Sequence, residues 1–457
     1  MTRPTSTVIQ MAYQNAHASA PLYIPVKVIC NTPDEELERN ITANSAQPLP
    51  WVQFAPEHQK VAVMCGGGPS LAEHIDDIKE LQANGGVIFA MNAASQFLRS
   101  FGIVVDYQVI ADAKPETSTL VDPEACHHLI ASQVHPSTLA KCSRTTLWHM
   151  AIDEEMDRLF PEERRKAGGY ALIGGGASVG NSAVCIAYVM GYRQLEIFGF
   201  DSSHRGEESH AYDQPMNRFI MTVDVEWAGK TYKSSVAMKA QAEKFQITGQ
   251  ALKKAGCTVN VHGKGLLPAM WNTPAANLRE QDKYQLMWST DEYRAGSPGE
   301  RVVPTILHYM KPKGLVIDFG CGTGRASLAL NRHGLDVLLI DFADNCRDEE
   351  AMLLPFLQWD LTRPLPPSAD YGICTDVLEH IPPADVPTVL DNILASARNV
   401  FFQISTVPDH FGALIDSQLH LTVEPHAWWK AELAKRGEIA WEDDQTIASL
   451  FVVRSNT

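Results

Sequence analysis

The sequence lacks the features that would assign it to a membrane, to a disulfide-stapled scaffold or to the secretory pathway. No run of about 18 apolar residues occurs in the 457-residue chain, and the N-terminal stretch has no continuous apolar segment. The nine cysteines form no C-x-x-C pair, and several lie inside apolar runs, where a thiol acts as a small apolar side chain. These absences predict a cytoplasmic protein in a reducing compartment.

Basic residues are also scarce. The chain has 38 Lys and Arg against 54 Asp and Glu, which gives a net charge of −16. Such a charge repels phosphate backbones, and no basic stripe interleaved with aromatic residues offsets it. The composition therefore disfavours nucleic acid as a partner and leaves the oligomeric state open.

Two stretches of the chain alternate between short apolar runs and helical patterns. The apolar runs include 61–65, 86–91 and 105–111 in the first stretch and 314–320 and 336–342 in the second. Strands separated by helices imply crossover connections and a sheet covered on both faces. The predicted fold class is α/β, with two doubly wound, mostly parallel-sheet, Rossmann-like domains in tandem.

Composition suggests where these domains begin and end. Residues 1–55 carry scattered Pro, Asn and Thr without a period and are interpreted as an irregular lead-in. The first domain is placed at 56–270, a linker rich in Gly, Pro and polar residues at 271–300, and the second domain at 301–457.

The most informative motif opens the second domain. The run VIDFGCGTGR at 316–325 places three glycines between a buried strand and a helix, so that the backbone can turn sharply and approach a ligand. Asp341 ends the next strand, where a carboxylate can accept hydrogen bonds from both hydroxyls of a ribose. The pair predicts a nucleoside-binding site.

The second domain resembles the class I S-adenosylmethionine-dependent methyltransferases over most of residues 300–457. The resemblance rests on the D-x-G-C-G-T-G loop, the acid at 341, the Asp-Leu pair in LQWDLTRPLP and the segment CTDVLEHIPP at 374–383. It implies S-adenosylmethionine as cofactor. The implied contacts are Asp318, Gly320, Gly322 and Gly324 to its methionine part, Asp341 to the ribose, Asp360 and Leu361 to the adenine, and Thr375 and Asp376 along the cavity.

The sequence indicates the catalytic groups of this domain less clearly than its cofactor contacts. Methyl transfer needs an in-line nucleophile, and an oxygen or nitrogen acceptor usually also needs a base or firm positioning. His380 and His420 are the candidates. Some members of the resembled family hold a divalent metal at an acid-x-x-Glu-His pattern, which Asp376, Glu379 and His380 fit; alternatively, Glu379 and His380 only cap a turn. The metal requirement and the methylated atom remain open.

The first domain has two glycine-rich turns, CGGGPSL at 65–71 and IGGGASVGNS at 173–182, each between a strand and a helix. Such turns expose backbone N–H groups to an anion, and neither turn contains the G-K-[ST] lysine of a P-loop. Both turns are expected at one ligand crevice. The predicted nucleotide-binding residues are Gly66, Gly67, Gly68, Pro69, Ser70, Asn92, Gly175, Gly176, Ala177 and Ser178.

These turns, with GFD at 199–201 and SHA at 209–211, resemble a family that groups archaeal hydroxymethylpterin diphosphokinases with bacterial motility accessory factors and has a sialyltransferase-like fold. The similarity covers about residues 60 to 265. It implies a nucleotide-activated donor, either a CMP-sugar or ATP with magnesium. For glycosyl transfer, His210 is the expected acid or base; for diphosphoryl transfer, Asp112 and Asp201 are the expected magnesium ligands.

The predicted protein is therefore a bifunctional transferase. A methyltransferase domain is fused to a glycosyltransferase-like domain, and the two act on a glycan or a small metabolite. Two alternatives stay open for the first domain: a hydroxymethylpterin-type diphosphokinase, or a binding module without catalytic activity.

Overall fold

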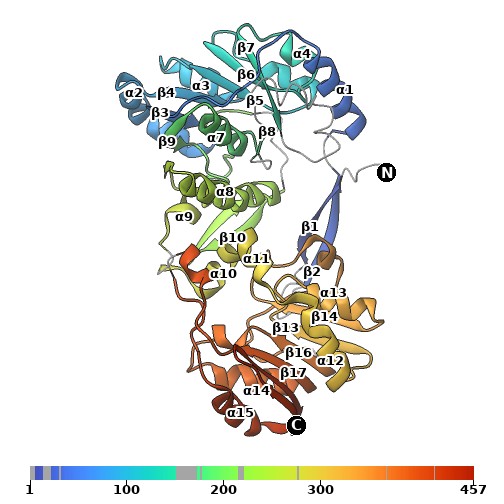
Figure 1. The fold of residues 1–457 in the computed structure, drawn as a ribbon. Coiled ribbons are helices and arrows are strands. Elements are labelled where there is room, and N and C mark those ends of the chain that lie inside the picture. The colour runs from blue at the N-terminus through green and yellow to red at the C-terminus, as the bar shows by residue number, and fades with distance from the viewer. Residues whose placement is uncertain are drawn as a thin grey trace. The chain divides into compact units, whose positions relative to one another are not determined.

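The computed structural model describes residues 6–13, 22–29, 32–150, 172–174, 178–214, 221–274, 277–366, 368–415 and 417–456. The chain divides into two compact units, each with its own sheet (Figure 1). One unit runs from Cys30 to Thr273 and includes Met1–Thr5; the other combines Ser6–Ile29 with Pro274–Thr457. None of the described helices has both the length and the apolar character that crossing a membrane requires.

The first unit contains an eight-stranded sheet in which every pairing is parallel. The strand order is β12 (Thr258–Val261), β9 (Tyr192–Phe198), β3 (His58–Cys65), β4 (Val87–Met91), β5 (Tyr107–Ile110), β6 (His127–Ala131), β7 (Thr145–Met150) and β8 (Leu172–Ile173). The order changes direction between β3 and β9. A crevice is expected there because the crossover connections leave the sheet on opposite sides.

Helices and one hairpin complete the first unit. The helices are α1 (Asp34–Ser45), α2 (Ile75–Ala83), α3 (Ala94–Ser100), α4 (Pro136–Leu139), α7 (Val179–Val189), α8 (Val236–Lys254) and α9 (Leu266–Asn272), with 3-10 turns at Pro69–His74 and Pro115–Leu120. Strands β10 (Val223–Trp227) and β11 (Lys230–Ser234) form a separate antiparallel hairpin. Central strands are apolar on both faces, as in β3, whose last four residues are buried.

The second unit contains a nine-stranded mixed sheet. Its order is β1 (Ser6–Tyr13), β2 (Leu22–Ile29), β15 (Phe356–Gln358), β14 (Asp336–Asp341), β13 (Leu315–Phe319), β16 (Ala369–Thr375), β17 (Ala397–Ser405), β19 (Ala448–Ser455) and β18 (Gly437–Asp444). The strands from β15 to β17 are parallel, and the outer ones are antiparallel. The order changes direction between β13 and β16, which places a second crevice at that point.

The helices of the second unit are α10 (Glu280–Trp288), α11 (Asp291–Gly296), α12 (Val303–Tyr309), α13 (Arg325–Arg332), α14 (Val386–Ser396) and α15 (His426–Ala434). Short 3-10 turns lie at Gly299–Val302, Glu349–Leu353, Leu378–His380 and Phe411–Leu414. Two apolar clusters fill the space between the sheet and these helices. The predicted Rossmann-like architecture, two tandem and mostly parallel α/β domains, is confirmed.

The N-terminal segment differs from the expected irregular lead-in. Strands β1 and β2 pair with each other, and Tyr23 and Leu22 of β2 pair with Phe356 and Leu357 of β15, so the hairpin extends the sheet of the second unit. Helix α1 lies in the first unit. Sequence periodicity missed the hairpin because its pairing partner is more than 300 residues away, and an edge strand with free N–H and C=O groups accepts such a partner.

The segment predicted as a linker at 271–300 also differs, because it forms the end of α9 and the helices α10 and α11. Tyr284, Met287 and Trp288 are buried in the core of the second unit. The tertiary contacts of these large side chains, rather than local propensity, keep the short helices folded.

Helix α1 is fixed to the first unit by Asn44, which yields a stability prediction. The Asn44 side chain is buried, and Nδ2 donates to Ser132 O at 2.9 Å and to Val134 O at 2.7 Å. We expect Asn44→Ala to lower the free energy of unfolding by about 1–3 kcal/mol, because two buried carbonyls lose their donor. Urea unfolding measures this loss, and Asn84→Ala at an exposed helix end is the control. Equal stability of the two variants would contradict the assignment.

Candidate functional site

A cavity of about 300 Å³ lies at the carboxyl ends of β13, β16 and β17. Gly320 and Gly322 follow β13, Thr375 and Asp376 lie at the end of β16, and Ser405 ends β17. The cavity thus occupies the point where the strand order of the second sheet changes direction. The sequence predicts cofactor contacts at Gly320, Gly322, Thr375 and Asp376, whereas it does not predict Ser405.

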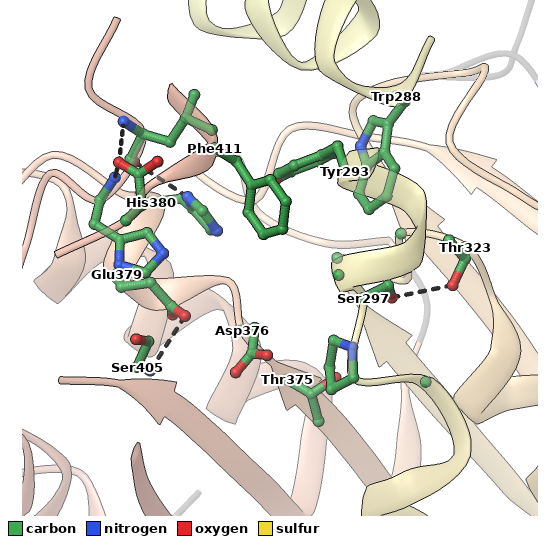
Figure 2. Close-up of a pocket in the computed structure, with 18 of the residues that line it drawn as sticks. Trp288, Tyr293, Ser297, Thr323, Thr375, Asp376, Glu379, His380, Ser405 and Phe411 are labelled. Atoms are coloured by element: carbon green, nitrogen blue, oxygen red, sulfur yellow. Dashed lines mark hydrogen bonds between the residues drawn. The ribbon is translucent and has the colours of Figure 1, made fainter. Parts of the chain in front are cut away.

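Aromatic side chains from the predicted linker form one wall of this cavity. Trp288 ends α10 and Tyr293 lies in α11; their rings are 4.6 Å apart, and Tyr293 is 5.6 Å from the ring of Phe411. Figure 2 shows Trp288 and Tyr293 on one side of the cavity, Glu379 and His380 on the other, and Asp376 between them. Sequence reasoning missed this wall; the available signal was the presence of large aromatics in an otherwise polar stretch.

Arg294 fixes the aromatic wall to the loop that follows β14. Its Nε donates to Trp288 O at 2.7 Å, one terminal nitrogen donates to Asn345 O at 2.6 Å, and the other forms an ion pair with Asp348 at 3.0 Å. Asp348 also accepts from Nε of Arg325 at 2.6 Å. The network connects α11 with the start of α13, directly after the glycine loop.

The glycine loop after β13 is closely packed by its own chain. Gly320 and Gly322 have φ values of +75° and +48°, and an added Cβ would lie 2.4 Å from Val377 and 2.9 Å from Trp288, respectively. Larger residues are excluded both by the left-handed backbone and by these neighbours. The loop therefore packs closely against these side chains, and the N–H groups of Gly320, Cys321 and Gly322 donate within the second unit, to Ile340 O and Asp341.

Asp341 holds this loop through a hydrogen bond to its backbone. It is 6% exposed, its Oδ2 accepts from Gly322 N and its Oδ1 from Ala343 N, each at 3.0 Å. Burial raises the pKa of Asp341 to about 6, while these backbone donors favour the charged form. The described residues that line the cavity do not include Asp341.

Helix α10 covers the end of β14, where the sequence predicts the ribose. Gln281 Nε2 donates to Phe342 O at 2.7 Å, and Gln285 Nε2 donates to Asp344 at 3.0 Å. The ring of Tyr284 packs against Phe342. Helix α10 therefore packs over the residues that directly follow Asp341.

Four other predicted cofactor residues are not among the described residues that line the cavity: Asp318, Gly324, Asp360 and Leu361. Asp318 is fully buried and accepts from Ser327 Oγ at 2.7 Å, which anchors the loop from the core. Gly324 precedes α13 as its N-cap with φ +73°. Asp360 lies in an exposed turn, where it accepts from Thr362 N, and Leu361 packs in the core; neither lines the described cavity.

His380 and His420, the predicted catalytic histidines, both line the cavity with Glu379. Their rings are 4.8 Å apart, and burial lowers the pKa of His380 to about 4, so its imidazole is neutral at pH 7. Asp376 accepts from Gln403 Nε2 at 3.0 Å, and burial raises its pKa. The structure brings His420, rather than Asp376, next to Glu379 and His380.

A second cavity, of about 190 Å³, lies in the first unit where the strand order reverses between β3 and β9. Its lining includes the turn Gly66–Gly68 after β3, Asn92 after β4, and the segment Gly199–Ser202 after β9. Ser178 caps α7 by accepting from Asn181 N and also lines the cavity. The predicted Gly175, Gly176 and Ala177 lie outside the described residues.

Asp201 supports the first glycine turn. Its Oδ2 accepts from both N and Oγ of Ser70 at 2.9 Å, and an added Cβ on Gly68 would lie 2.2 Å from it. Pro69 is buried in the same turn. Asp112 is exposed, and its Oδ1 accepts a hydrogen bond from Lys114 N. It is not among the described residues that line the cavity. The structure therefore does not bring together the two carboxylates predicted to bind magnesium.

His210 packs on the first glycine turn, although it is more than 140 residues away in sequence. Ala211 N donates to Gly67 O at 3.0 Å, and an added Cβ on Gly67 would lie 3.0 Å from Cδ2 of His210. Nδ1 of His210 is 2.9 Å from Ser209 Oγ. Burial lowers the pKa of His210 to about 4, so the ring is neutral at pH 7.

Asn181 and Gln241 also line this cavity and were missed from the sequence. Asn181 is 1% exposed, and its Nδ2 donates to Gln241 O at 3.3 Å. Asn181 lies in the GNS sequence that follows the second glycine turn, and this position was the available signal. Gln241 lies on α8, where only the tertiary packing of α7 against α8 brings it to the cavity.

The two sheets with their cavities define tandem Rossmann-like α/β domains, and comparison with known families agrees. Residues 35–207 match the family described as 6-hydroxymethylpterin diphosphokinase MptE-like, and residues 287–451 match the family described as methyltransferase domain. Residues 35–207 thus resemble the MptE-like family and residues 287–451 the methyltransferase family, each over less than half of the chain. The first match includes the turn at Gly66–Gly68 but ends before His210. No curated protein matches the chain in sequence.

Several solved structures are similar at low identity. The MAf glycosyltransferase from Magnetospirillum magneticum AMB-1 is 17% identical, with a TM-score of 0.39; the match covers 60% of this chain and 46% of that one. The magnesium protoporphyrin IX methyltransferase from Synechocystis PCC 6803 with bound SAM is 20% identical, with a TM-score of 0.29 and coverage of 37% and 84%. The 1,6-didemethyltoxoflavin-N1-methyltransferase from Burkholderia thailandensis is 16% identical, with a TM-score of 0.30 and coverage of 36% and 82%.

The buried Asp318 gives a pH-dependent stability prediction. Desolvation raises its pKa to about 7 in the folded protein, so the folded state holds this proton more tightly than the unfolded state. Its stability contribution is fully present below about pH 4 and is lost as the pH rises through 7. We expect the Tm of the wild type, relative to that of Asp318→Asn, to fall between pH 5 and pH 8. Calorimetry checks this, with Asp336→Asn at the exposed start of β14 as control. A pH-independent difference would contradict it.

Proposed function

We propose that the second domain transfers a methyl group from S-adenosylmethionine to a small-molecule or glycan acceptor. The observation that carries this proposal is the chemistry of the larger cavity, which combines the aromatic faces of Trp288 and Tyr293 with the carboxyl group of Asp376 beside the glycine loop. Aromatic faces and carboxylates both attract a cation. The match of residues 287–451 to a methyltransferase family supports the same conclusion.

The residues present fit such a cofactor. The backbone at Gly320 and Gly322 would hold its methionine part, and Asp341 would hold the ribose after a shift of α10. When bound, S-adenosylmethionine supplies an electrophilic methyl carbon on a positively charged sulfur. The aromatic wall would exclude water, and Asp376 would face the positive charge. The acceptor would enter from the side of His380 and His420, which can orient it, and the neutral imidazole of His380 can accept its proton.

For the first domain, we propose a binding site for a nucleotide-activated sugar, with His210 as the base that deprotonates the acceptor hydroxyl. His210 lies beside the glycine turn, and its imidazole is unprotonated at pH 7, so it can accept a proton. The described cavity residues include no Lys or Arg, so this cavity suits a singly charged phosphodiester better than a triphosphate. The separation of Asp112 from the cavity disfavours the diphosphokinase alternative. A binding module without catalytic activity remains the second candidate.

The cofactor assignment predicts the effect of Asp341→Ala. We expect at least a tenfold loss of affinity for S-adenosylmethionine, because the carboxylate both fixes Gly322 and serves the ribose; hydrogen bonds to charged groups contribute about 1.5–3 kcal/mol. Isothermal titration calorimetry with the full chain measures the affinity. Asp336→Ala, at the opposite end of the same strand, should bind as the wild type does. Equal affinity of the two variants would refute the site, and no binding by the wild type would refute the cofactor.

The first-domain proposal predicts a nucleotide preference. We expect CMP to bind at least tenfold more tightly than ATP with magnesium, because the described cavity residues include neither a cation for a triphosphate nor a carboxylate pair for the metal. Calorimetry with both nucleotides checks this. In turnover with a CMP-sugar, His210→Gln should lose most of the activity, whereas His204→Gln, outside the described cavity lining, should retain it. Tighter ATP binding would support the diphosphokinase, and unchanged turnover in His210→Gln would refute the role of His210.

A further inference from the structure

Glu379, His380 and His420 form a cluster on one side of the larger cavity. Each offers one ligand atom, and these atoms lie within 4.8 Å of one another. Glu379 and His380 belong to the 3-10 turn after β16, whereas His420 lies in the loop before α15, so the tertiary structure brings them together. Figure 2 shows Glu379 and His380 facing the cavity opposite Trp288.

Both imidazoles are fixed by hydrogen bonds at Nδ1. Nδ1 of His420 is 2.6 Å from Val407 O, and Nδ1 of His380 is 3.1 Å from Leu419 O and 2.7 Å from the hydroxyl of Tyr284. A carbonyl oxygen only accepts hydrogen bonds, so Nδ1 of His420 carries the proton and its Nε2 has the lone pair. An imidazole held in this way by a second partner at its other nitrogen is typical of metal-ligating histidines.

Glu379 provides an independent observation. Its side chain is 0% exposed; Oε1 accepts from Ser405 N at 3.1 Å, whereas Oε2 is buried and has no hydrogen-bond partner among the described residues. An unsatisfied buried carboxylate oxygen is costly, and an ionised one is retained only beside a positive charge. A turn-capping role uses Oε1 and leaves Oε2 unexplained.

We propose that Glu379, His380 and His420 bind one divalent cation that positions an oxygen atom of the methyl acceptor. The set differs from the one implied by the sequence pattern, since Asp376 is replaced by His420. Two imidazoles and one carboxylate suit Mn²⁺, Fe²⁺, Co²⁺ or Zn²⁺, whereas Mg²⁺ and Ca²⁺ prefer sets made of oxygen ligands. Three protein ligands also leave coordination positions free for another molecule. The acceptor class is therefore a hydroxyl or another oxygen-bearing group. The acceptor part of this inference rests on the proposed methyl transfer; cation binding does not.

The test is direct binding of Co²⁺ to the untagged full-length chain after treatment with a chelator. Visible absorption of Co²⁺ reports its ligands, and calorimetry gives the affinity and the number of ions. We expect one site, with at least a tenfold loss of affinity in Glu379→Gln and in His420→Gln. His410→Gln, which alters a histidine that lines the same cavity outside the cluster, is the matched control. It should bind Co²⁺ as the wild type does. Mg²⁺ should compete at least a hundredfold less well than Mn²⁺.

Two outcomes would overturn the proposal: no Co²⁺ binding by the wild type, or equal binding by the wild type and both cluster variants. Circular dichroism of the variants shows whether they fold. Tyr284→Phe gives a further readout, because loss of the hydroxyl beside Nδ1 of His380 should weaken Co²⁺ binding by about tenfold and alter its spectrum, as changes next to metal ligands do. Titration of S-adenosylmethionine in the presence of a chelator tests the cofactor site separately, so failure of the cation site is distinguishable from failure of the methyltransferase proposal.

Discussion

Both cavities depend on one constraint of parallel sheets. Where the crossover connections of two neighbouring strands leave the sheet on opposite sides, no connecting segment covers the carboxyl ends of that strand pair. In the first unit this occurs between β3 and β9, and in the second between β13 and β16. In each case a glycine turn follows the first strand of the pair, and a carboxylate fixes it: Asp201 holds the turn at Ser70, and Asp341 holds the loop at Gly322. The buried carboxylates thus hold the glycine turns in place beside the cavities.

Helix α10 contacts two parts of the second unit. Gln281 and Gln285 donate to residues that follow β14, and Tyr284 reaches His380. Trp288, at the end of the same helix, packs on Gly322. If S-adenosylmethionine binds at Asp341 as proposed, a shift of α10 would also change the environment of His380.

Several site residues could be predicted from the sequence because their motifs are local. The spacing of glycines between a strand and a helix predicts Gly66–Gly68 and Gly320–Gly322, and both lie at the cavities. The roles of acids were harder to predict, because an Asp at a strand end can face a ligand or its own backbone. Asp318 is anchored to Ser327 in the core, and Asp360 closes an exposed turn. The structure does not support the magnesium role predicted for Asp112 and Asp201. Asp201 accepts a hydrogen bond from Ser70 N, and no pattern in the sequence indicates this contact.

The sequence by itself determined the class of each domain, since alternation of apolar runs with helical patterns and the position of glycine turns are local properties of the backbone. Only the tertiary structure decided which distant residues share a cavity. His420 lies 40 residues from His380, Trp288 comes from a segment without a clear period, and the N-terminal hairpin pairs with β15 across the chain. These contacts arise from burial of large apolar side chains and from pairing of free strand edges. Neither force has a signature in the neighbouring sequence.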